Sequence, residues 1–343
     1  MTKALNSDLN FGGRYAVTMF SFMNEILAAK RTTNEIMTDY LESGISKIVE
    51  IDAPIHFRTF PDISEAEISA FKAIIDAQGA TLATMGAFSD RAISRTEFRS
   101  NTELESLLNL QLQAVKKLGG TGIRIGAGMI EDELLKFAIH TAEALDLWVM
   151  VEIQGTQLPD SEVVTKLLEL NSAVQSPAFS LLMDTSAIMG TLPPGYLQAL
   201  ERSGITKDQI SEIGDHWGKE SLNDLRGWLV GKYISQNISP LSRGLLLNLM
   251  TRFGWSKPAD WREIYPLVKS VQLKFWDLTD EDRQLSKPMK ELVTELAAVN
   301  YHGDMTGEWG GHEWHTLKTP ALEALRWHRG IYDSVVSEMR AAQ

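Results

Sequence analysis

Short apolar runs alternate with amphipathic stretches of helical spacing along most of this chain. The runs have the length of strands and lie at residues 14–22, 46–51, 80–85, 121–125, 148–153, 179–183 and 270–275, with an eighth entered through residues 300–307. A strand that is apolar throughout is typical of a parallel sheet covered on both faces. Repeated strand–helix units of this kind predict an α/β protein, a (β/α)8 TIM barrel that spans residues 1–343 as a single domain.

The alternation is interrupted between the sixth and seventh predicted strands. About residues 188–268 separate them, which is far more than one crossover helix needs. The segment shows helical periodicity, for example at residues 244–252, and contains Pro193, Pro194 and several tryptophans. We expect a helical insertion that either covers part of the barrel mouth or forms a layer outside the barrel.

Charge and composition narrow the possible partners. The formal net charge is −12 over 343 residues, so nucleic acid and anionic membranes, which attract basic surfaces, are not expected partners. There is no cysteine, which excludes disulfides, thiolate metal sites and cysteine nucleophiles. The first residues lack the apolar core of a signal peptide, and no apolar run reaches transmembrane length. We therefore expect a cytoplasmic protein.

Four side chains with oxygen donors lie on the last four predicted strands, at or near their ends: Glu152, Asp184, Gln272 and Glu308. The C-terminal ends of barrel strands converge on one small volume, where TIM-barrel active sites lie. Carboxylate and amide oxygens suit a hard divalent cation, such as Mn²⁺ or Mg²⁺, better than tetrahedral zinc. The pattern predicts that these four residues bind one divalent metal ion.

Pairing with basic residues is another explanation for the acids at the strand ends. Arg124, Lys274 and Arg14 lie on predicted strands and could hold the acids in a salt-bridge network at the barrel mouth. We favour the metal, because four consecutive strands contribute and because clustered carboxylates repel one another unless a cation compensates them.

A metal ion at this position suggests chemistry next to a carbonyl group. It would polarise the carbonyl of a hydroxy-ketone, and a nearby carboxylate could then remove the adjacent proton. Glu152 and Glu308 come from strands separated by two others, so we predict that they flank the substrate as acid/base groups. His312 is predicted to contact the substrate or transfer a proton, with a purely structural role as the alternative.

Four residues are predicted to contact the substrate: Gln154, Lys274, His302 and Trp309. Gln154 and Lys274 each follow a predicted metal ligand by two positions and therefore face the same side of their strands. His302 and Trp309 belong to a glycine-rich segment that also holds His315, YHGDMTGEWGGHEWH. Glycines permit the close approach of backbone to a ligand.

Four segments resemble the xylose isomerase-like TIM barrels, the sugar phosphate isomerase/epimerase superfamily: VEIQG, LLMDTS, VQLKFWDL and GEWGGHEW. The resemblance covers nearly the whole chain outside the insertion. It implies a divalent metal, often manganese, held by Glu152, Asp184, Gln272 and Glu308, with both glutamates serving as acid/base groups. Gln272 departs from the family, which has histidine at this position.

The superfamily includes lyases, among them the large subunits of C-glycoside deglycosidases, which act on 3-keto C-glycosides with a small β-sheet partner subunit. This branch implies a carbohydrate or glycoside substrate and either a small partner subunit or a homo-oligomer. Gln154 stands where members of the branch have a histidine. The two glutamine replacements also leave open a non-catalytic barrel that acts as a binding or scaffold subunit.

Overall fold

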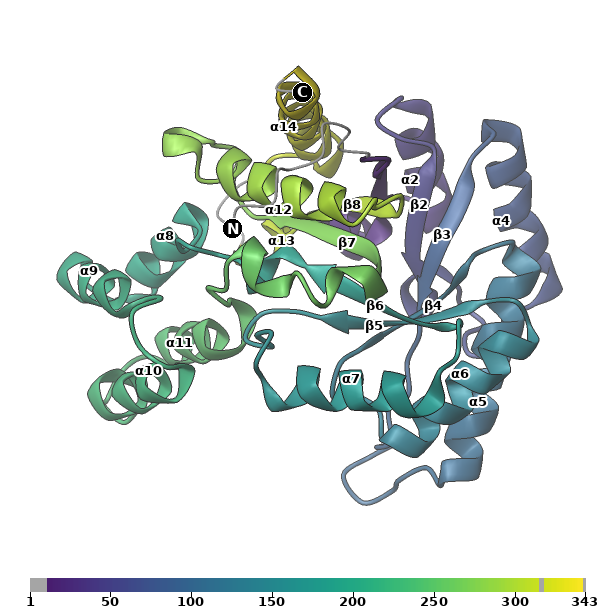
Figure 1. The fold of residues 1–343 in the computed structure, drawn as a ribbon, viewed down its shortest axis with the longest axis horizontal. Helices are drawn as coiled ribbons and strands as arrows, with labels where there is room; N and C mark the ends of the chain where they lie inside the picture. The colour runs from purple at the N-terminus through teal and green to yellow at the C-terminus, as the bar shows by residue number, and fades with distance from the viewer. Residues whose placement is uncertain (1–10, 315–317, 342–343) are drawn as a thin grey trace, which may run out of the picture.

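The computed structural model describes residues 11–314 and 318–341. Within this part of the chain, parallel strands close into a barrel in chain order (Figure 1). The strands are β1 (Arg14–Thr18), β2 (Ile48–Asp52), β3 (Thr81–Gly86), β4 (Gly122–Gly126), β5 (Trp148–Ile153), β6 (Phe179–Asp184), β7 (Val268–Phe275) and β8 (Asp304–Trp309). The barrel closes where β8 pairs with β1, with Arg14 opposite Asp304. The predicted (β/α)8 fold is confirmed.

The longer helices around the barrel follow the strands. They are α2 (Thr33–Glu42), α4 (Glu65–Gln78), α5 (Asn101–Leu118), α6 (Asp132–Ala144), α7 (Glu162–Val174), α12 (Ser286–Ala298) and α14 (Ala321–Ala341). Local sequence sets their ends: α5 begins with a capping box between Ser100 and Glu103 and stops at Gly119, whose φ is +81°. None of the helices within the described residues is long and apolar enough to cross a membrane.

Short helical segments follow several strands at the barrel mouth. They are η1 (Met19–Phe22) and α1 (Met23–Leu27) after β1, α3 (Ala53–His56) after β2, η2 (Thr185–Ala187) after β6, η6 (Glu281–Arg283) after β7 and α13 (Gly311–Trp314) after β8. They bring residues of the loops close to the strand ends.

Alternation along the strands separates a hydrophobic core from a polar interior. On β5, Val151 and Ile153 join the core between strands and helices, whereas Glu152 between them lines a cavity at the mouth. On β8, Trp309 belongs to the core and its neighbour Glu308 lines the same cavity. Successive strand residues point to opposite faces, so the acids at the strand ends face inward.

The insertion lies between β6 and β7, as predicted. It consists of α8 (Pro194–Ser203), α9 (Lys207–His216), α10 (Leu222–Leu229), η3 (Val230–Ile234), α11 (Pro240–Arg252), η4 (Pro258–Trp261) and η5 (Tyr265–Leu267). Its helices share a hydrophobic cluster of their own, which includes Tyr196, Leu246 and Phe253. In Figure 1, α8–α11 gather on one side of the molecule, away from α4–α6. Arg252, at the end of α11, lines the cavity at the barrel mouth, so the insertion borders the mouth.

Candidate active site

A cavity of about 200 Å³ opens at the C-terminal ends of the strands. Its lining includes Phe20, Asp52, Arg124, Glu152, Gln154, Arg252, Lys274 and Glu308. TIM-barrel enzymes carry their chemistry at this end of the barrel. Most of the polar side chains in this lining belong to two clusters, each centred on one basic side chain.

The first cluster is centred on Arg124 of β4. Its guanidinium contacts Glu152 Oε2 at 2.5 Å, Asp52 Oδ1 at 2.8 Å and Glu50 Oε1 at 3.3 Å. Gly86 of β3 leaves the space for this contact, because a Cβ there would collide with the Asp52 carboxylate. One positive charge therefore serves three acids from β2 and β5.

Burial dominates the acid–base behaviour of this cluster. It raises the pKa of Glu50 to about 7, although Arg124 pulls the value down. The pKa of Asp52 is raised for the same reason, again against the opposing effect of Arg124. A single guanidinium does not compensate the desolvation of these carboxylates.

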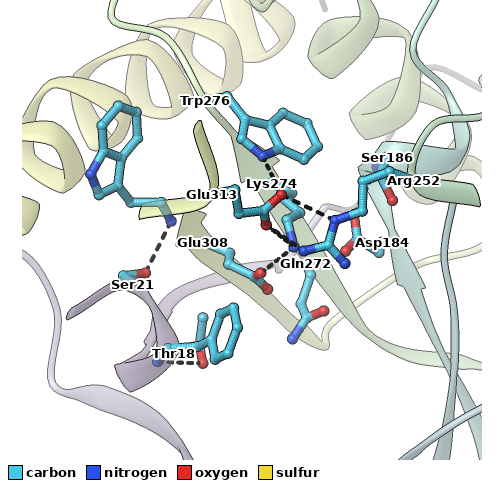
Figure 2. A network of polar contacts seen from close by, with 12 residues as sticks. Thr18, Ser21, Asp184, Ser186, Arg252, Gln272, Lys274, Trp276, Glu308 and Glu313 are labelled. Carbon is cyan, nitrogen blue, oxygen red and sulfur yellow. Dashed lines mark hydrogen bonds and ion pairs between the residues drawn. The ribbon is translucent and has the colours of Figure 1, made fainter. Parts of the chain in front are cut away.

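The second cluster is centred on Lys274 of β7. Its ammonium contacts Glu308 Oε1 at 2.6 Å and Glu313 Oε1 at 3.2 Å. Glu313 also accepts from Arg252 at 2.6 Å and from the Trp276 indole at 3.1 Å. Figure 2 shows these side chains around Lys274, which links the end of the barrel to the insertion.

The two cations in this cluster change the titration of Glu313. Burial alone would raise its pKa, but Lys274 and Arg252 outweigh it and lower the pKa to about 2. Burial also opposes the charge on Lys274, yet Glu308 and Glu313 raise its pKa above the ordinary value. Lys274 and Glu313 are therefore both ionised near neutral pH.

Asp184 and Gln272 lie beside each other on adjacent strands of the barrel. They are register partners on β6 and β7, and both side chains are buried. Asp184 Oδ1 accepts from the backbone of Ser186, and Gln272 donates to Glu50 Oε1 at 2.8 Å. The other oxygens, Asp184 Oδ2 and Gln272 Oε1, are buried without a hydrogen-bond partner. Burial raises the pKa of Asp184 to about 7, with Lys274 acting in the opposite direction.

The predicted metal ligands offer the oxygen donors that a hard cation prefers, but two of them already pair with basic side chains. Among the described residues, no three His, Asp or Glu side chains are grouped closely enough to hold an ion as they stand. Arg124 holds one oxygen of Glu152, and Lys274 holds one oxygen of Glu308. The unpartnered oxygens of Asp184 and Gln272 nevertheless call for a positive partner, because buried polar atoms are normally satisfied. The donor set therefore fits a hard cation, which would compete with two internal cations for the glutamates.

The structure assembles most of the predicted site residues. Four of them line the cavity: Glu152, Gln154, Lys274 and Glu308. Two more, Asp184 and Gln272, are register partners on β6 and β7. The metal site and the salt-bridge network both remain possible explanations for the acids at the mouth. Glu152 pairs with Arg124 and Glu308 with Lys274, as the salt-bridge network predicts.

His312 lies on α13, next to the mouth. Its ring packs edge-on against Phe20 with centroids 4.9 Å apart. Burial lowers its pKa, which favours the neutral imidazole, and its Nδ1 is buried without a hydrogen-bond partner. The role of His312 in proton transfer stays a prediction, and His315 lies outside the described residues.

Three predicted positions need correction. His302 precedes β8, at the opposite end of the barrel from the cavity, where a Cβ on Gly12 would collide with its ring. Trp309 faces outward and packs against Phe275 in the core, with ring centroids 5.1 Å apart. Arg14 pairs with Asp304 at the start of β8, away from the mouth. We therefore withdraw the substrate contacts predicted for His302 and Trp309, and the place of Arg14 in a network at the mouth.

Sequence reasoning missed four polar residues of the site: Glu50, Asp52, Arg252 and Glu313. Glu50 and Asp52 had a signal, because they alternate within the strand sequence IVEID in the way that Glu152 stands within VMVEI. Arg252 and Glu313 had none, since their contact joins the insertion to α13 across 61 positions.

Similarity in sequence points to one group of curated proteins. No family model matches the chain. It is 24% identical to the 3'-dehydrocarminate deglycosidase alpha subunit of Microbacterium sp., over 96% of this chain and 97% of that protein. It is also 24% identical to the C-glycoside deglycosidase alpha subunit of Microbacterium trichothecenolyticum, over 89% of this chain and 85% of that protein.

Similarity in structure gives the fold. D-psicose 3-epimerase from Clostridium cellulolyticum H10, solved with D-tagatose, aligns with a TM-score of 0.55 and 12% identity over 94% of this chain and 98% of that chain. The IolI protein, solved with a zinc atom, aligns with a TM-score of 0.54 and 12% identity over 95% of this chain and 98% of that chain. The chain thus has the fold of the xylose isomerase-like sugar isomerases and epimerases, and its sequence resembles C-glycoside deglycosidase alpha subunits over nearly its whole length.

Proposed function

We propose that this chain is a divalent-metal-dependent enzyme that removes a proton next to the carbonyl of a keto-sugar, sugar derivative or glycoside. The outcome is isomerisation, epimerisation or β-elimination, the last as in deglycosidation. One observation carries the proposal: Glu152 and Glu308 line one cavity, and the register partners Asp184 and Gln272 on β6 and β7 have buried, unpartnered oxygens. The sequence relatives are named deglycosidase alpha subunits, which supports a glycoside substrate.

Glu152, Asp184, Gln272 and Glu308 are the residues that would hold the metal ion, for which we propose Mn²⁺, with Mg²⁺ as the alternative. When bound, such an ion polarises the substrate carbonyl and stabilises negative charge on its oxygen. Arg124 and Lys274 each hold one oxygen of an essential glutamate, at 2.5 and 2.6 Å. These contacts hold carboxylates on β5 and β8, which β6 and β7 separate in the barrel.

The two glutamates divide the proton transfers in this proposal. One carboxylate takes the proton from the carbon next to the carbonyl, and the other returns a proton to the product. Return to the same carbon on its opposite face gives an epimer. Delivery to the former carbonyl carbon, with transfer of the neighbouring hydroxyl proton to the former carbonyl oxygen, gives an isomer. In elimination, the bond to the leaving group breaks as the double bond forms, and the proton goes to the leaving group. Neutral His312 is a candidate for relaying a proton at this end of the barrel, and Gln154 for contacting a substrate hydroxyl.

Exchange of the substrate proton in D₂O tests this function. Purified protein with Mn²⁺ is mixed with a panel of keto-sugars and 3-keto-glycosides, and deuterium incorporation is followed by NMR. Glu152→Gln and Glu308→Gln should each slow exchange by about 10²–10⁴-fold, the usual contribution of a general acid or base. Glu169→Gln, on the exposed surface of α7, is the matched control. Failure of the wild-type protein to exchange any substrate of the panel would count against the proposal.

A non-catalytic binding or scaffold subunit is the competing function. It is favoured by Gln154 and Gln272 and by the engagement of Glu152 and Glu308 with Arg124 and Lys274. Elemental analysis after incubation with Mn²⁺ and desalting separates the two, because a scaffold needs no stoichiometric metal. The relatives are named alpha subunits, so we also propose a small partner subunit, and both assays should be repeated with it.

A further inference from the structure

The amide of Gln272 has two different surroundings. Its nitrogen donates a hydrogen bond to Glu50 Oε1 at 2.8 Å, across the barrel from β7 to β2. Its oxygen is buried without a partner, as is Oδ2 of Asp184 on the adjacent strand. In the view of Figure 2, the amide oxygen lies on the side of Asp184 and the nitrogen points away from it.

Chemistry at Glu50 selects this orientation. A carboxylate accepts hydrogen bonds and an amide nitrogen only donates them, so a reversed amide would bring two acceptors together. Glu50 is fully buried, and its Oε1 is also 3.3 Å from Arg124 Nε, so two nitrogen donors lie beside this one oxygen. Leaving an amide oxygen buried and unpartnered costs free energy, which a ligand for that oxygen would recover.

We propose that Glu50 is a positioning residue that turns the Gln272 oxygen, rather than its nitrogen, toward Asp184 and the bound cation. The inference rests on the proposed metal-dependent function and adds a residue to it. An amide presents an oxygen donor only in one of its two orientations, whereas a carboxylate has an oxygen at both positions. Glu50 supplies what the glutamine lacks.

Binding of Mn²⁺ alone, measured by isothermal titration calorimetry on the full chain, tests the proposal. In Glu50→Gln the partner of Gln272 can donate as well as accept, so both amide orientations become available. The affinity for Mn²⁺ should fall about tenfold, as for loss of other groups that orient a metal ligand. The double variant Glu50→Gln, Gln272→Glu reverses the donor and acceptor and gives a carboxylate with no unfavourable end. It should recover at least the wild-type affinity.

Glu169→Gln, the same substitution on the exposed surface of α7 and outside the cavity lining, is the matched control. It should bind Mn²⁺ with nearly the wild-type affinity. Thermal unfolding in EDTA checks that each variant is folded. Equal affinity of wild type and Glu50→Gln, or a double variant as weak as the single one, would overturn the inference alone. A wild-type protein that binds no Mn²⁺ would overturn both the inference and the metal-dependent function.

Discussion

Two buried clusters at the barrel mouth contain the same residue types and behave in opposite ways. Arg124 alone meets Glu50, Asp52 and Glu152, and the pKa of Glu50 rises to about 7. Lys274 and Arg252 both meet Glu313, and its pKa falls to about 2. Both carboxylates are removed from water, so burial does not explain the difference. The balance of neighbouring charges does: Glu50 has one cation and three acids near it, whereas two cations contact Glu313.

The contrast has a functional side. The Lys274 cluster is balanced and ties the insertion to the barrel through Arg252. The Arg124 cluster has an excess of acid, and its member Glu50 also reaches Gln272 beside Asp184. Shortage of positive charge is therefore concentrated where we propose that a cation binds. Substitutions that alter one cluster at a time test this difference.

Removal of the Lys274 ammonium should have the largest effect. Lys274→Met leaves Glu308 and Glu313 buried without their shared partner, so the free energy of unfolding should drop by about 3–5 kcal/mol. Urea unfolding in EDTA measures it. Lys269→Met is the matched control, because Lys269 lies on the same strand with an exposed side chain over the Trp148 ring. Similar stability of both variants would mean that the second cluster is not held by Lys274.

The opposite pKa shifts should produce opposite pH dependences of stability. The pKa of Glu313 is lowered to about 2 from 4.5, so its contribution is complete above pH 4.5 and lost as the pH falls toward 2. The pKa of Glu50 is raised to about 7 from 4.5, so its contribution is complete below pH 4.5 and lost as the pH rises toward 7. Each shift amounts to at most about 3 kcal/mol.

Urea unfolding from pH 3 to 8 in EDTA, on the wild type, Glu313→Gln and Glu50→Gln, separates the two contributions. Relative to the wild type, Glu313→Gln should be most destabilised above pH 5 and lose this deficit as the pH falls. Glu50→Gln should gain relative stability between pH 4.5 and 7. Parallel profiles for all three proteins would show that the two clusters do not differ in charge balance.

The barrel could be predicted from the sequence, and so could two members of each cluster. These are Arg124 and Glu152 in the first cluster and Lys274 and Glu308 in the second. Strand–helix alternation and inward alternation along strands are local properties, so the barrel and the inward positions of Glu152 and Lys274 followed from them. Alternation along β8 places Trp309 on the outer face when Glu308 faces inward. Alternation along β2 would likewise have identified Glu50 as an inward-facing acid, like Glu152 on β5. His302 was misplaced because β8 runs between it and His312 and carries the two histidines to opposite ends of the barrel.

The remaining part of the site could not be read from local pattern. Arg252 and Glu313 meet because folding brings the end of α11 near α13, and the sequence of neither segment predicts this contact. Asp52 fits its place because Gly86 on the next strand has no side chain. Such contacts depend on tertiary packing, which periodicity does not encode.

Replacement of Arg124 by lysine should have the smallest of these effects and sharpens the comparison most. A lysine keeps the charge but presents one ammonium in place of the planar guanidinium that reaches three acids. Arg124→Lys should therefore lower the free energy of unfolding by about 1.5–3 kcal/mol, the value of a hydrogen bond to a charged group. Urea unfolding at pH 7 in EDTA measures the change, with Arg262→Lys, in an exposed pair with Glu295, as control. If Arg124→Lys were as stable as the control, charge alone would organise the first cluster, and the fork geometry of the arginine would have no part in holding Glu50 near Gln272.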